Sequence, residues 1–354
     1  MARKRRMEIS GLNVLFCLLV IFIHIISYPV SAFPVNTLRY NLVMLPWRLS
    51  SFVVQGFILL SGVKVFLNGK DKLTFGAYFK ARISGVIVPY AVCFLIYYLC
   101  FMRVYAYPLE VGFILKHFLL GSLVCHLYFI PIIFQFDLLF PVWKRVVNRC
   151  SPMLVIPFAI LASQLLEGYL PQMIETAFEG CKFPYNDRIF TTYLSYWLIG
   201  CYIGKYYDAF CEMLKKNFTT VCVLFAISLV AVVGFSYLAF NQLVYIPYVN
   251  TVHGIYVLFV CMFLYALALK IPAEKLEKIP FLQEIDGASF YIYLYHMLTI
   301  LFAGWVLQRL GIQAEGFAFI IRSVLAYGLT LPGCILYRKL KKRVPKLQSR
   351  KEIV

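Results

Sequence analysis

The stretch GLNVLFCLLVIFIHIISYPV, residues 11–30, decides the fold class of this chain. Twenty residues of helix rise about 30 Å, which is the thickness of the hydrocarbon core of a bilayer. The basic residues directly before it, from Arg3 to Arg6, favour a cytoplasmic N-terminus. We therefore interpret the stretch as a retained first transmembrane helix. A signal peptide fits less well, because the apolar run is long and prolines crowd the one candidate cleavage site.

One titratable residue, His24, lies inside this apolar run. Polar residues in a membrane span are costly, so they face the bundle interior or a water-filled cavity and mark functional sites. With the N-terminus inside, His24 lies about 20 Å into the core, beyond the midplane. An imidazole there can take a proton from an attacking hydroxyl. The alternative is a histidine that only packs, hydrogen-bonded to a neighbouring helix.

The rest of the chain repeats the apolar pattern of the first helix. Hydrophobic residues make up 62% of the sequence and charged residues 14%, against about a quarter charged in soluble proteins. We predict an all-α polytopic membrane helix bundle, a single domain over residues 1–354 with both termini cytoplasmic and a basic tail at about 338–354. Ten transmembrane helices are expected near 11–31, 44–67, 83–102, 122–143, 152–170, 190–207, 217–239, 251–270, 287–308 and 316–337.

The distribution of basic residues explains the net charge of +18. Of the 34 lysines and arginines, 25 fall on the predicted cytoplasmic segments, as the positive-inside rule requires. The charge therefore reflects orientation, and we expect no nucleic-acid partner. The tail is expected to contact anionic lipid head groups or to remain solvated. The eleven cysteines show no CxxC or CxxH spacing, so neither a disulfide framework nor a metal site is predicted.

The third predicted helix begins at a pair of cations, Lys80 and Arg82. Cations at the cytoplasmic boundary suit an anionic ligand such as a phosphate-bearing cofactor. Anchoring of the helix by snorkelling side chains is the alternative.

Further polar side chains fall within the predicted spans. Asn13 lies three helical turns below His24 on the same face of the first helix. Asp137 lies toward the inner end of the fourth helix, where we expect it to pair with a cation. The residues that we predict to line a polar path are Asn13, Gln55, Ser61, His126, Tyr293 and His296.

Five segments, taken in order, carry a family resemblance over about residues 7–340. They read ISGLNVLFCLLVIFIH, SSFVVQGFILLSG, FKARISGVIVPY, HLYF and SFYIYLYH. Each segment alone is weak, but their order and spacing together are fairly specific. The chain resembles the membrane acyltransferase 3 family, and within it the short ten-helix members. Those are similar to surface-polysaccharide O-acyltransferases and to the membrane protein of intercellular-adhesin clusters.

The resemblance implies a site as well as an activity. It implies that an acyl group, acetyl or succinyl, passes from cytoplasmic acyl-CoA to a sugar hydroxyl. His24 matches the essential first-helix histidine of the family, and Arg82 matches the first arginine of the motif linked to the donor. Two departures stand out: Asn13 replaces a first-helix arginine, and the second arginine of the motif is absent. Lys80 is the nearest basic residue to supply the missing charge, from another helical face.

We therefore expect an integral O-acyltransferase of the cell membrane, with His24 as general base and Arg82 and Lys80 binding the donor. Acetyl-CoA or succinyl-CoA would be the donor, without a metal. The expected partners are membrane lipid, a glycan or lipid-linked saccharide, and glycan-assembly proteins. A polysaccharide exporter or flippase would use the same polar path as a conduit. A non-catalytic membrane protein of the same fold is the third alternative.

Overall fold

The computed structural model describes residues 6–178 and 182–343, and every regular element in these ranges is a helix. The predicted all-α class is therefore confirmed. Part of the basic leader, Cys181 and the tail beyond residue 343 lie outside the described residues.

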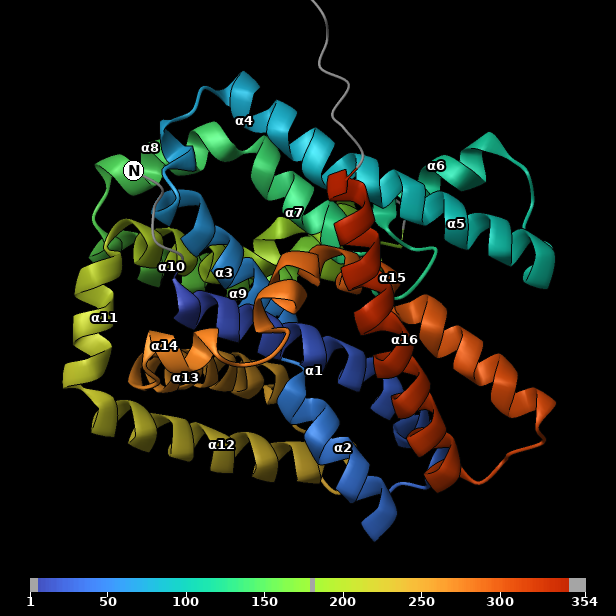
Figure 1. Ribbon diagram of the computed structural model, residues 1–354. Coiled ribbons are helices and arrows are strands. Elements are labelled where there is room, and N and C mark those ends of the chain that lie inside the picture. Colours follow the sequence, from blue (N-terminus) through green and yellow to red (C-terminus); the bar gives the residue numbers. More distant parts are fainter. Residues whose placement is uncertain (1–5, 179–181, 344–354) are drawn as a thin grey trace, which may run out of the picture. The chain divides into compact units, whose positions relative to one another are not determined.

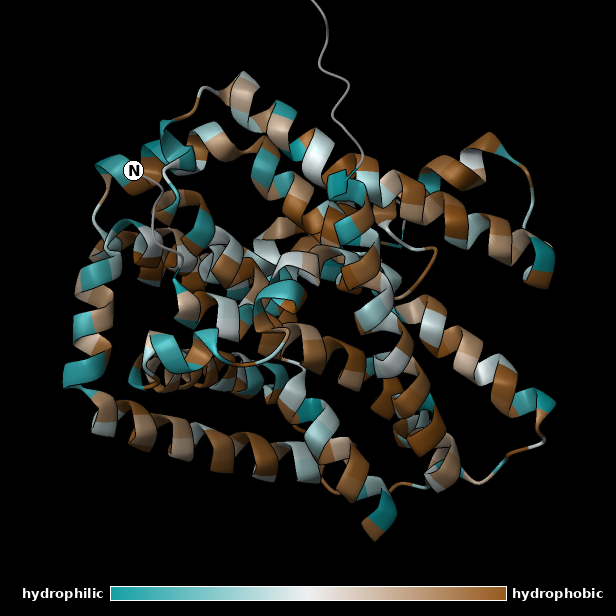
Figure 2. Cartoon of the chain, viewed as in Figure 1, coloured by the Kyte–Doolittle hydropathy of each residue, from teal (hydrophilic) through white to brown (hydrophobic). Residues whose placement is uncertain are grey.

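Eight helical stretches of the described chain are long and apolar enough to cross a membrane. Figure 2 shows this on α12 (Phe218–Phe240), which is brown along most of its length, whereas the neighbouring α11 (Tyr207–Lys216) carries teal residues. These stretches correspond to eight of the ten expected spans. They are Met7–Ala32, Leu38–Leu67, Phe75–Tyr105, Pro152–Ala177, Phe218–Phe240, Val249–Lys270, Leu282–Arg309 and Glu315–Arg343.

The other two expected spans are built from shorter helices. The segment 122–143 contains a turn, then α7 (Phe129–Leu138), and then the start of α8 (Phe140–Arg149). Pro141 opens α8, and proline suits a helix start because it lacks the N–H that a continuing helix needs. The segment 190–207 starts as a 3₁₀ turn, and α10 (Leu194–Lys205) rises only about 18 Å.

The described residues form two compact units. Unit 1 comprises the chain up to Ala32 and from Pro272 onward, and unit 2 comprises Phe33–Ile271. The two units are described separately below.

Unit 1 is a bundle of three long helices and one short helix. In it α1 (Met7–Ala32), α15 (Leu282–Arg309) and α16 (Glu315–Arg343) pack against one another (Figure 1). The short α14 (Ala273–Glu277) packs against α1.

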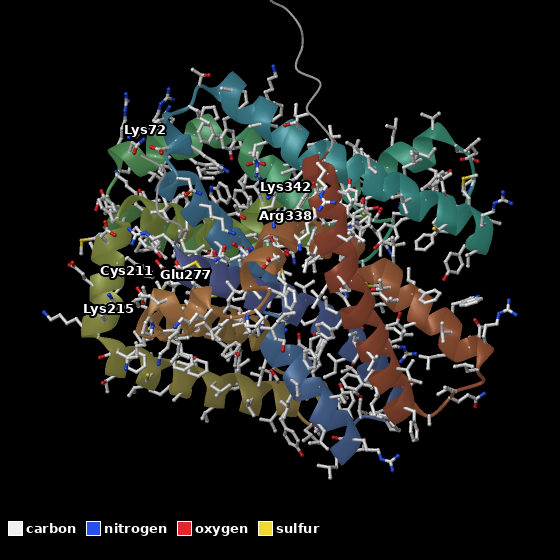
Figure 3. All side chains as sticks on the ribbon, viewed as in Figure 1. Lys72, Cys211, Lys215, Glu277, Arg338 and Lys342 are labelled. Carbon is white, nitrogen blue, oxygen red and sulfur yellow. The ribbon has the colours of Figure 1, made fainter. Side chains whose placement is uncertain are left out.

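Polar contacts join α16 to the other two long helices of unit 1. The Tyr327 hydroxyl donates to the Leu18 carbonyl oxygen at 2.8 Å. The hydroxyls of Thr299 and Thr330 lie 2.7 Å apart. Figure 3 labels Arg338 near the C-terminal end of α16, and a Cβ at Gly287 of α15 would collide with its guanidinium. The missing side chain at Gly287 therefore lets this cation lie against α15.

Unit 2 contains the remaining helices. They are α2 (Leu38–Ser50), α3 (Val53–Leu67), α4 (Phe75–Arg82), α5 (Val88–Tyr105), α6 (Val111–Leu120), α7, α8, α9 (Pro152–Ala177), α10, α11 (Tyr207–Lys216), α12 (Phe218–Phe240) and α13 (Val249–Lys270). A π-helical segment, Ile83–Ile87, joins α4 to α5 directly after Arg82. Side-chain hydroxyls fix two helix starts, because Thr74 accepts from the Ala77 N–H and Ser151 accepts from the Met153 N–H.

The core of unit 2 depends on a close approach of α3 to α10. A Cβ at Gly62 would lie 2.6 Å from the Trp197 carbonyl oxygen, and one at Gly200 would collide with the Leu59 carbonyl. Small residues let helix backbones approach in this way in membranes. Aromatic stacking surrounds this close approach, since the Phe136 and Trp197 rings lie 4.6 Å apart.

Candidate functional site

The helix pair α1 and α15 places two histidines side by side within unit 1. The ring centroids of His24 and His296 are 5.1 Å apart, with 38° between the ring planes. His296 is fully buried and His24 half-buried. The ring of Tyr293, one turn before His296, lies 6.4 Å from the His296 ring. Three of the predicted site residues therefore share one region of this unit.

Backbone carbonyl groups of α15 determine which nitrogen of the His296 ring is protonated. Its Nδ1 lies 2.8 Å from the Tyr293 carbonyl oxygen and 3.1 Å from that of Ile292. A carbonyl oxygen can only accept a hydrogen bond, so Nδ1 must be the protonated nitrogen. In the neutral ring Nε2 is then the basic nitrogen.

A second polar pair lies nearer the N-terminal ends of the same two helices. Asn13 Nδ2 donates to Asp286 Oδ1 at 2.7 Å. Asn13 precedes His24 by eleven residues and Asp286 precedes His296 by ten, so the pairs are separated by about 16 Å of helix. Because residue numbers rise together along both helices, α1 and α15 run parallel. Between these two levels the Cys17 thiol of α1 donates to the Ser289 carbonyl oxygen of α15 at 3.8 Å.

Arg82, the residue predicted to bind the acyl donor, is held in unit 2 by a buried carboxylate. Arg82 Nε lies 2.6 Å from Asp137 Oδ2, and the Tyr78 hydroxyl donates to Asp137 Oδ1 at 2.5 Å. The Asp137 side chain is 1% exposed and that of Arg82 is 24% exposed. The expected pairing of Asp137 with a cation is thus confirmed, and it crosses from α7 to α4.

Two lysines accompany this ion pair. Lys70 precedes α4, and burial, together with the Arg82 guanidinium, lowers the pKa of its ammonium group. Lys80 is exposed on α4. Arg82 has only the Asp137 partner within the described residues, so its other guanidinium nitrogens remain open to an anion.

The remaining predicted residues also lie in unit 2. Gln55 lines a polar cavity of about 590 Å³, and Ser61 is half-buried on α3. His126 is buried, with its ring edge-on to that of Tyr97 at 5.7 Å. Within residues 6–178 and 182–343 no group of three His, Cys, Asp or Glu side chains could hold a metal ion.

Sequence reasoning missed several polar partners. Asp286 was assigned to a loop, but α15 begins at Leu282, so Asp286 lies within its second turn. His253 of α13, whose Nε2 lies 3.0 Å from the Ser51 hydroxyl, carries the same signal as His24, a histidine in an apolar helix. That signal would have found it.

Comparison with known families agrees with the fold and the motifs. Residues 8–339 match the acyltransferase 3 family, whose model is described as an acyltransferase domain. The chain therefore belongs to the membrane acyltransferase 3 family and is a multi-pass membrane protein. Neither a curated protein nor a solved structure matches the chain.

Proposed function

We propose that this membrane acyltransferase moves an acetyl or succinyl group from cytoplasmic acyl-CoA to a hydroxyl of a cell-surface or lipid-linked glycan. Membership of the family supplies the reaction class. The observation that carries the proposal is the histidine pair of α1 and α15. Two imidazoles 5.1 Å apart in apolar spans are costly to maintain, which favours a chemical role over packing.

His24 is the general base in this proposal. As the acceptor hydroxyl attacks the thioester carbonyl carbon, its proton passes to the His24 imidazole. The new C–O ester bond forms, the C–S bond breaks, and the CoA thiolate leaves. The imidazolium then returns a proton to the thiolate, so ester and CoA thiol are the products. The tautomer of His296 leaves Nε2 as an acceptor, which suits a ring that orients the attacking hydroxyl or holds a water.

Arg82 binds the phosphate end of the donor. Asp137 accepts from Arg82 Nε and is itself held by the Tyr78 hydroxyl, so the guanidinium is oriented before an anion arrives. Orientation in advance lowers the entropy lost when a ligand binds. Lys80 and Lys70 lie on and next to the same helix and add positive charge. Three cations on this short segment suit a ligand with several phosphates, and they stand in for the absent second arginine.

This activity places the protein in the plasma membrane beside glycan-assembly proteins. The donor is made in the cytoplasm and the acceptor lies outside. A helix bundle that binds the donor at the inner face and the acceptor at the outer face would allow the acyl group to cross the membrane while the glycan stays outside.

Mass spectrometry of the surface glycan tests the proposal in cells. Cells carrying wild-type protein should display an acylated glycan whose ester is removed by mild alkali. His24→Ala should abolish the modification while the protein accumulates in the membrane. Ser27→Ala is the matched control, because the Ser27 hydroxyl only donates to the His24 carbonyl oxygen on the same helix. Full acylation by His24→Ala would overturn the role of His24, and unmodified glycan retained inside deleted cells would indicate an exporter.

A further inference from the structure

A polar cavity lies entirely within unit 2. It has a volume of about 590 Å³, within the range of about 300–1,000 Å³ typical of small-molecule sites. Four segments form its wall: the junction of α2 and α3, the middle of α9, residues 184–196 and the start of α13. In the predicted orientation the connections between the fifth and sixth and between the seventh and eighth predicted spans are external, and these segments adjoin them. The cavity therefore belongs to the extracytoplasmic half of the chain.

One side of the cavity is held by a network between α2 and α13. Arg48 Nη2 donates to Asn250 Oδ1 at 3.0 Å and to the Val249 carbonyl oxygen at 3.4 Å. His253 Nε2 lies 3.0 Å from the Ser51 hydroxyl. These bonds position an arginine, an amide and an imidazole on one wall before any ligand binds, as small-molecule sites do.

The opposite wall carries polar groups with incomplete bonding. The Glu167 side chain of α9 is half-buried, and its carboxylate has no hydrogen-bond or ion-pair partner within the described part of the chain. Asn186 Nδ2 donates to the Glu167 carbonyl oxygen at 2.8 Å. The buried Oδ1 of Asn186 accepts no hydrogen bond from the described residues. A carboxylate removed from water without a partner is costly. A ligand that donates hydrogen bonds would remove that cost.

The charges of the lining select the class of ligand. Arg48 is the cation of the lining, and Glu167 and Asp187 are its two carboxylates. Asp187 Oδ1 lies 3.6 Å from Arg188 Nε, so its charge is already offset. The Glu167 carboxylate, which has no ion-pair partner among the described residues, disfavours phosphates and other anions beside it. Hydroxyl groups both donate and accept, so they match a wall that mixes carboxylates, amides and a guanidinium. Tyr193 and Tyr196 add aromatic surface for the apolar face of a sugar ring.

We propose that this cavity binds an uncharged or amino-sugar residue of the acceptor glycan. The proposal rests on the proposed function, because it names the place where that reaction's acceptor is recognised. Glu167 accepts hydrogen bonds from sugar hydroxyl or amino groups, and Arg48 and Asn250 donate and accept on the other wall. Glycan reaches the cavity from the outer face of the membrane.

Saturation-transfer NMR on the purified full-length protein in nanodiscs tests the assignment. Three probes are used: tri-N-acetylchitotriose, its de-acetylated amino-sugar counterpart and trigalacturonate. The first two should bind and the anionic trisaccharide should not. Glu167→Gln should weaken binding about tenfold or more, the loss expected for one charge-assisted hydrogen bond. Gln164→Ala, an exposed position on the same wall, should weaken binding with less risk to folding.

Control variants separate this proposal from the proposed reaction. Glu110→Gln removes an exposed carboxylate outside the cavity and should bind the sugars normally. Sugar binding lost in Glu167→Gln supports the cavity even if no acyl transfer is found. Sugar binding unchanged in both cavity variants, no binding of any probe by folded wild-type protein, or preference for trigalacturonate would overturn it.

Discussion

Replacing Asp137 with asparagine should destabilise the protein by stranding the charge of Arg82. The Asp137 carboxylate accepts from Arg82 Nε at 2.6 Å and from the Tyr78 hydroxyl at 2.5 Å, and its side chain is 1% exposed. Asparagine keeps the shape and an acceptor oxygen for Tyr78 but removes the charge. The variant therefore isolates the electrostatic part of the contact.

The size of the effect follows from the burial of the two partners. Breaking a fully buried ion pair costs about 3–5 kcal/mol. The Arg82 side chain keeps 24% of its surface exposed, so screening reduces its share to about 2 kcal/mol. Weakening the Tyr78 hydrogen bond from a charged to a neutral acceptor adds about 1 kcal/mol. We expect a loss of about 3 kcal/mol for Asp137→Asn and more for Asp137→Ala, which leaves the Tyr78 hydroxyl unbonded.

Thermal unfolding of the purified protein in detergent measures the loss, with Asp71→Asn as a control carboxylate outside the pair. At about 2–4 °C per kcal/mol, the apparent melting temperature of Asp137→Asn should fall by about 6–12 °C. Adding Arg82→Gln to Asp137→Asn should restore part of the lost stability, with a coupling free energy of about 1–3 kcal/mol between the two positions. An Asp137→Asn protein that melts like wild type, or a double variant whose losses simply add, would refute the reasoning.

Three further predictions concern helix contacts. Asn13→Asp places two carboxylates together at Asp286, so this variant should melt lower at pH 7 than at pH 5. The difference should be larger than for Asn13→Ala, which only removes a hydrogen-bond donor from Asp286. Gly200→Val should cost more than the usual ~1–3 kcal/mol of overpacking and abolish a monodisperse size-exclusion peak, while Gly76→Ala, with open space around it, should not. His296→Ala should lower glycan acylation about tenfold in mass spectra of the surface glycan at unchanged protein level, the loss of one polar contact; an unchanged signal would contradict its place beside the base.

Hydropathy and length were enough to predict most of the fold. A membrane span needs about 20 apolar residues, and that requirement predicted the eight long helical stretches, with ends up to eight residues from those observed. It failed at 122–143, because an apolar run does not reveal a backbone break at Leu139 before Pro141. The start of α15 was placed at 287 rather than Leu282 because Glu284 and Asp286 look like loop residues in a hydropathy profile.

The sequence predicted which residues belong to the candidate site but not how they are arranged in space. His24 and His296 each appeared as a histidine in an apolar span, but their sequence positions carry no information on their 5.1 Å separation. Asn13 was noted as a departure from the family pattern, and its partner Asp286 lies 273 residues away. Asp137 was expected to pair with a cation near the inner end of its helix. Which cation it would be depended on the packing of α4 against α7, which periodicity does not determine.

Acyl transfer by purified protein tests the central claim most directly. The protein in nanodiscs is supplied with acyl-CoA labelled in the acyl group and with a short glycan acceptor, and label on the glycan is counted against time. Wild-type protein and Ser27→Ala should transfer label and release CoA thiol in equal amounts. His24→Ala should transfer about 10²-fold less or slower still, the contribution of a general base. Equal transfer by His24→Ala and wild type would contradict the account.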